Sequence, residues 1–166
     1  MPSRRAPGPA VPVILEGWQA ALRETASRFR EASDRYAWEA DREEALDGDA
    51  MREFAQGWAA RAGRLEERLR ALDLLPTLPD PEKEALGRML DHVVAWVAPE
   101  GKTAGLLDEL LVLEEGNREA IAGALGADAG GRHLDAGTRS ALEDAAAFSN
   151  HVSARLAALR DADGAD

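Results

Sequence analysis

Residues 106–121 read LLDELLVLEEGNREAI and carry the clearest helical pattern of this chain. One face of a helix repeats every three to four residues, so a single stripe joins Leu107, Leu110, Glu114, Asn117 and Ile121. Glu114 and Asn117 therefore fall in the middle of an otherwise apolar face. Because an unpaired buried carboxylate is costly, the pattern predicts that Glu114 has a hydrogen-bond partner, a metal or a raised pKa.

The composition favours an all-α fold. Alanine, leucine, arginine and glutamate dominate the 166 residues, β-branched residues are few, and charged residues make up 31%. The length suits one domain with a core of its own. We expect a disordered N-terminal tail at 1–11, a single helical bundle at 12–161 and a disordered C-terminal tail at 162–166.

Apolar stripes and helix-boundary residues predict four main helices and one short helix. The main helices are expected from near Pro12 to the charged stretch after Trp38, from the turn at Asp47–Asp49 to Pro76, from Thr103 to near Leu125, and from between Asp135 and Thr138 to the polar tail at Asp161. The short helix begins at Asp80-Pro81-Glu82, where an aspartate can cap and proline can take the first helical position. The prediction is a four-helix bundle with an additional short helix in the connection between the second and third main helices.

Charge and residue usage exclude several classes of function. The formal net charge of −11 argues against a nucleic-acid partner, which needs clustered lysine and arginine on one face. Without cysteine, disulfides, thiolate metal sites and thiol catalysis are excluded. No stretch approaches the roughly 20 apolar residues that span a bilayer, and the apolar run at 11–15 is too short for a signal peptide. We expect a cytoplasmic protein without a membrane partner.

The first and last helices resemble a known superfamily. The pattern Leu15-x-x-Trp18-x-x-x-Leu22-x-Glu24-x-x-x-x-Phe29-Arg30-Glu31-Ala32 is similar to the opening helix of an uncharacterised bacterial branch of the ferritin-like four-helix bundles. The segment from Leu110 to Leu125, followed by Leu142 to Arg160, resembles the final helix pair of that branch. The resemblance covers residues 12–160 and implies a ferritin-like bundle.

The same resemblance implies a di-iron or di-manganese site in the bundle core. Such a site takes one Glu from each of two helices and a Glu-x-x-His from each of the other two. The three histidines, His92, His133 and His151, are preceded at this spacing by residues other than glutamate, so the motif is missing. The di-metal ligands are therefore largely absent, and we expect no cofactor, with iron or manganese as the alternative.

Glu114 keeps more than one interpretation. As a structural group it would accept hydrogen bonds in a polar core layer with Thr25, Asn117 and Ser149, or from Arg61, and fix the helix register. As a functional group it would be a minimal ligand site for a cation or small polar molecule, which makes it the one weak candidate for a metal ligand. It could also reach the rim if the helix is slightly rotated.

No residue pattern indicates a catalytic site, which favours a non-catalytic protein over an enzyme. We therefore expect a soluble helical bundle that acts as a binding or protein-interaction module, with a homodimer or another protein as its partner. The short helix is the candidate interface, with Met89, Val93 and Trp96, because its own sequence places apolar residues on nearly all of its faces. The alternative is a ferritin-like metal-binding oxidoreductase or iron-storage protein with a degenerate or intersubunit carboxylate site.

Overall fold

The computed structural model describes residues 16–42, 47–74, 102–128 and 130–164. These residues form no strand, and their helices are α1 (Gly17–Ala40), α2 (Gly48–Ala71), α4 (Lys102–Gly126) and α5 (Ala136–Asp163). The all-α prediction is therefore confirmed for this part of the chain. The expected short helix lies outside the described residues, together with its candidate interface residues Met89, Val93 and Trp96.

Aspartate side chains cap two of the helices. Asp47 accepts a hydrogen bond from the Ala50 amide at 3.0 Å, so α2 begins at Gly48, within the stretch that the sequence predicts as a turn. Asp135 accepts a hydrogen bond from the Thr138 amide at 2.7 Å and caps α5 within the predicted window. In both places a short acidic side chain satisfies an amide that has no partner within the helix.

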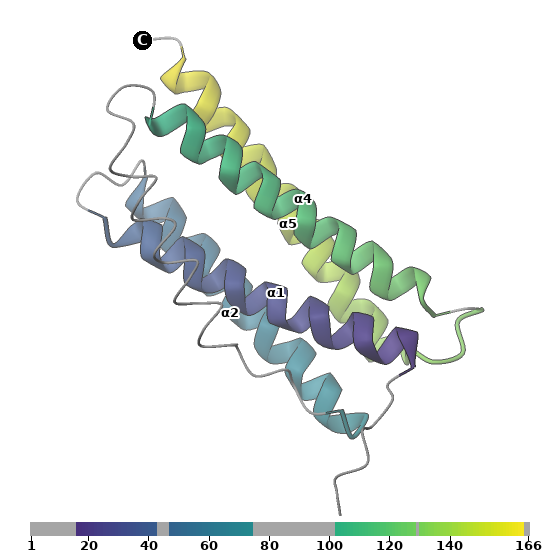
Figure 1. Cartoon of the computed structure of the whole chain (residues 1–166). Coiled ribbons are helices and arrows are strands. Elements are labelled where there is room, and N and C mark those ends of the chain that lie inside the picture. Colours follow the sequence, from purple (N-terminus) through teal and green to yellow (C-terminus); the bar gives the residue numbers. More distant parts are fainter. Residues whose placement is uncertain (1–15, 43–46, 75–101, 129, 165–166) are drawn as a thin grey trace, which may run out of the picture.

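The four helices pack as two antiparallel hairpins, α1 with α2 and α4 with α5 (Figure 1). α1 also contacts α4, and α2 contacts α5. Both of these pairs are antiparallel: Thr25 near the start of α1 bonds to Ala120 late in α4, whereas Arg35 late in α1 pairs with Glu109 early in α4.

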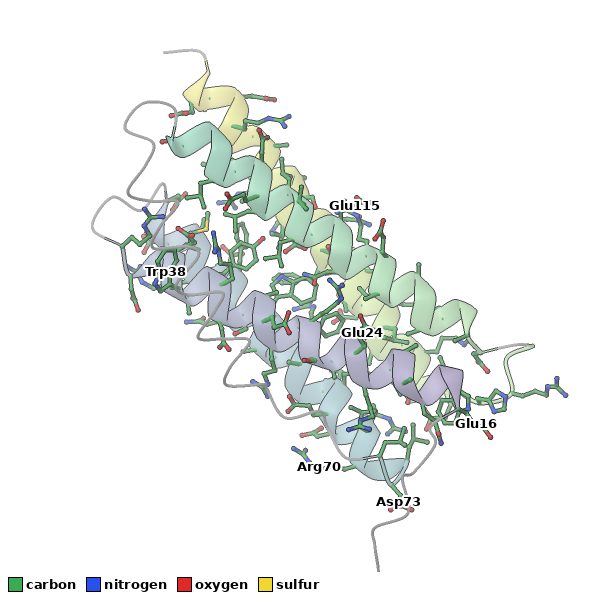
Figure 2. The ribbon with its side chains drawn as sticks, in the orientation of Figure 1. Glu16, Glu24, Trp38, Arg70, Asp73 and Glu115 are labelled. Atoms are coloured by element: carbon green, nitrogen blue, oxygen red, sulfur yellow. The ribbon has the colours of Figure 1, made fainter. Side chains whose placement is uncertain are left out.

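α2 and α4 consequently run in the same direction. The last residues of α2 and the first residues of α4 lie at opposite ends of the bundle (Figure 1). Figure 2 marks the two ends: Trp38 lies where α1 ends, and Glu16 lies at the other end. Side chains from all four helices fill the space between these ends (Figure 2).

The core follows the predicted stripes. Large side chains from every helix are fully buried, which is the expected result of packing one apolar face of each helix inward. The most deeply buried large residues are Leu22, Phe29, Tyr36, Met51, Phe54, Trp58, Leu65, Leu69, Leu107, Leu110, Ile121 and Leu142. The buried polar side chains among the described residues are Thr25, Ser33, Glu39, Glu114, Asn117, Asp128, Thr138 and Ser149.

The outer faces carry charged pairs. Arg30 of α1 donates two parallel hydrogen bonds to Glu66 of α2, at 2.7 and 2.8 Å. Arg61 of α2 pairs with Asp144 of α5 at 3.2 Å. Within the described ranges, no helix has the length and apolar character needed to cross a membrane.

Candidate functional site

Glu114 is fully buried (0% exposed) and accepts a hydrogen bond from each of the other three described helices. The Tyr36 hydroxyl of α1 donates to Oε1 at 2.8 Å, and the Trp58 indole N–H of α2 donates to the same oxygen at 3.0 Å. The Ser149 hydroxyl of α5 lies 2.5 Å from Oε2. We call these four residues the Glu114 layer. Its burial removes the interpretation in which Glu114 reaches the rim.

The layer forms because each member occupies the inward stripe of its helix. Glu114 follows Leu107 and Leu110 on α4, and Ser149 follows Leu142 on α5 at seven residues, two helical turns. The long side chains of Tyr36 and Trp58 then reach across the core to one carboxylate. Each of the four described helices contributes one member, so the layer links all four helices through one carboxylate.

Of the other residues that the sequence placed beside Glu114, Thr25 and Asn117 are also fully buried. The Thr25 hydroxyl bonds to the backbone carbonyls of Ala21 at 2.8 Å and Ala120 at 3.2 Å, and so joins α1 to α4 without contacting the carboxylate. Neither amide atom of Asn117 has a hydrogen-bond partner among the described residues. Ser149 is the one predicted neighbour whose side chain bonds to the Glu114 carboxylate.

Arg61 is directed elsewhere. Its guanidinium donates to the Gly57 carbonyl at 3.1 Å, pairs with Asp144, and lies 3.9 Å above the ring of Phe148. The side chain therefore covers the α2–α5 seam and brings no positive charge into the layer.

Tyr36 and Trp58 are the partners that sequence reasoning missed. Periodicity places both on inward faces, where an aromatic side chain is most simply interpreted as apolar packing. A buried tyrosine or tryptophan normally finds an acceptor for its O–H or N–H, so two such residues in a core already predict a nearby acceptor. This signal indicates that Tyr36 and Trp58 need an acceptor, but Thr25, Asn117 and Ser149 also offer inward-facing oxygens, so the sequence alone does not single out Glu114 as the partner.

Among the described residues, no positively charged side chain forms an ion pair with the Glu114 carboxyl group. Burial raises the pKa of Glu114, while hydrogen bonds from Ser149, Tyr36 and Trp58 oppose that shift. The Arg118 guanidinium, which bonds to Ser153 and Glu115, also opposes that shift of the pKa and is the smallest of these effects. Burial, and then the charge of Glu114, also raise the pKa of Tyr36, which keeps its hydroxyl a donor.

The raised pKa of Glu114 predicts a pH effect. The unfolded pKa is about 4.3, so between that value and the folded pKa the folded chain binds more protons, and stability falls as pH rises. Arg30 holds the pKa of Glu66 low, so the stability that this pair contributes is lost as the pH falls, which is the opposite pH dependence. Glu66 and the other titrating groups are common to the wild-type protein and the Glu114→Gln variant, so their effects cancel when the two are compared. The free energy of unfolding of Glu114→Gln, relative to that of wild type, should therefore increase from about pH 4 upward and level off above the folded pKa of Glu114. Urea unfolding from about pH 4 to 9 measures it, and a pH-independent difference would contradict the assignment.

A di-iron or di-manganese site needs more carboxylate and histidine ligands than the layer offers. Across the described segments, no group of three or more histidine, aspartate or glutamate side chains is placed to hold a metal ion. His151 is exposed and lies 4.0 Å from Glu53 on the α2–α5 seam, while His133 is exposed and stacks on Trp18 at a centroid distance of 5.3 Å. Both histidines are thus engaged at the periphery.

Comparison with known proteins identifies no relative of this chain. No family model matches the chain, and no curated protein or solved structure is significantly similar to it.

Proposed function

We propose that this chain is a ferritin-like helical bundle without a catalytic role, a cytoplasmic binding or protein-interaction module. One observation carries the proposal: the polar position at the centre of the bundle is filled by a carboxylate whose oxygens accept hydrogen bonds from tyrosine, tryptophan and serine. The layer is chemically suited to holding helices in register.

The choice of donors supports this role. An indole N–H donates and has no lone pair for a metal, and the Trp58 N–H is directed at Oε1 of Glu114. The Tyr36 hydroxyl shares that oxygen. In a di-metal site, the metal ions beside a bridging carboxylate need further oxygen and imidazole ligands. The groups around Glu114 are hydrogen-bond donors instead.

The ferritin-like part of the proposal is supported by helix direction. α2 and α4 run in the same direction, and the chain passes from one end of the bundle to the other between Leu74 and Lys102. Four-helix bundles with one long crossover connection include the ferritin-like folds. The superfamily assignment itself still rests on the pattern of the first and last helices.

The interaction surface is expected on the segment whose sequence is most apolar on all sides, with Met89, Val93 and Trp96. A homodimer is the simplest partner for such a surface. Light scattering at high protein concentration should then give twice the mass of one chain. A monomer at every concentration would contradict the dimer and leave a different protein as the partner.

Metal analysis tests the non-catalytic role. We expect protein produced with iron and manganese in the medium to contain well below one metal ion per chain, and added iron to leave its melting temperature unchanged. Near-stoichiometric metal would overturn the proposal in favour of a ferritin-like oxidoreductase or iron-storage protein. The Glu114→Gln variant then shows whether Glu114 is a ligand, because a ligand variant loses the metal.

A further inference from the structure

Asn117 leaves hydrogen-bonding capacity unused beside the Glu114 layer. Its side chain is fully buried, and its amide oxygen and nitrogen both lack a partner among the described residues. Buried side-chain amides are normally paired, so an orphaned one calls for an explanation. Asn117 follows Glu114 by three positions on α4, which places both side chains on one face, one above the other.

The Glu114 carboxylate also has unused hydrogen-bonding capacity on Oε2. Oε1 accepts two hydrogen bonds, from Tyr36 and Trp58, whereas Oε2 accepts one, from Ser149. An ionised carboxylate offers about four lone-pair positions, so Oε2 retains capacity for another partner. None of the described arginines forms an ion pair with Glu114, and a buried charge is normally balanced by a cation.

We propose that a partly hydrated alkali-metal ion, sodium or potassium, binds between Glu114 and Asn117. Oε2 of Glu114, the amide oxygen of Asn117 and a lone pair of the Ser149 hydroxyl supply neutral and singly charged oxygen ligands. A water on the ion accepts the N–H of Asn117, which an ammonium ion could not do. One carboxylate balances one positive charge, whereas a divalent ion would leave a buried excess charge. The inference goes beyond the proposed function, which needs no ligand in the core.

Thermal unfolding at pH 8 tests the site. The melting temperature is measured in sodium, potassium and tetramethylammonium chloride at equal ionic strength, the last ion being too large to enter the core. For the ion that binds, we expect a melting temperature about 3–6 °C higher than in tetramethylammonium when the ion is tenfold above its Kd. Equal melting temperatures in all three salts would overturn the proposal and leave a protonated carboxyl or a buried water beside Asn117.

Two variants locate the effect. Glu114→Gln removes the charge, and Asn117→Ala removes the amide while leaving room, so each should lose the difference between the salts. A difference that persists in both variants would place the ion elsewhere and overturn the proposal. Crystals grown with thallium(I), a potassium analogue, give a readout that does not depend on stability: an anomalous peak between the two side chains supports the site, and a peak-free core contradicts it. Failure here leaves the iron and manganese test of the proposed function unaffected.

Discussion

Replacing Glu114 with leucine is expected to destabilise the protein by about 3 kcal/mol, although the substitution removes a buried charge. The Tyr36 hydroxyl and the Trp58 N–H both lose their acceptor, and each buried donor left unpaired costs about 1–3 kcal/mol. Ser149 is less affected, because its hydroxyl can turn to the backbone carbonyl of residue 114 at 3.3 Å. Urea unfolding at pH 7 measures the loss.

Glu114→Gln is the matched control, and it should stay within about 1 kcal/mol of wild type at pH 7. The glutamine oxygen can accept from Tyr36 and Trp58, and its amide N–H can donate to the Ser149 hydroxyl. If leucine and glutamine cost the same, the hydrogen bonds do not hold the layer together.

A double variant separates hydrogen bonding from packing. Tyr36→Phe should destabilise the wild-type protein, where it removes a donor from a buried acceptor. In the Glu114→Leu background the same change should stabilise the protein, since it removes an orphaned hydroxyl. A Tyr36→Phe effect of the same sign in both backgrounds would contradict the assigned partnership.

Gly57→Ala is expected to destabilise the protein by about 1–3 kcal/mol, even though alanine is the better helix former. A Cβ at position 57 would lie 2.1 Å from Cζ of Phe148, whose ring packs directly against the backbone of α2. Arg61 covers that ring at 3.9 Å and Trp58 contacts it at a centroid distance of 5.3 Å, so the ring cannot move without disturbing both. Thermal or urea unfolding gives the difference in stability.

Gly63→Ala is the control for this effect on the same helix. A Cβ there meets no atom within 4 Å, so the variant should gain about 0.5–1 kcal/mol from helix propensity alone. Phe148→Ala provides a second check, because Gly57→Ala should become stabilising once the ring is gone. Equal effects at positions 57 and 63 would show that the Phe148 contact does not limit the site.

The sequence is sufficient to predict the helices and their inward faces, because those depend on local periodicity and capping. Spacing alone assigns Leu142, Ser149 and Glu114 to core faces, and all three are buried. A short acidic side chain can cap free amides, which predicts Asp135 at the start of a helix, and Asp135 does cap α5.

The contacts between helices required the tertiary structure. Periodicity identifies which face of each helix is buried, but the residues that meet across the core depend on how far one helix is shifted along another. That shift places Tyr36 and Trp58 on the Glu114 carboxylate and puts Thr25 on the carbonyl of Ala120.

Residue spacing along the chain is enough to establish that this protein is helical and that a carboxylate lies on an inward face of its fourth predicted helix, since spacing defines a face. The groups that surround that carboxylate follow from the tertiary structure and not from spacing. Hydrogen bonds act over about 3 Å, and a shift of one helical turn moves a side chain by about 5.4 Å. The partners of Glu114, and the unpaired amide of Asn117 beside it, are therefore properties of helix packing.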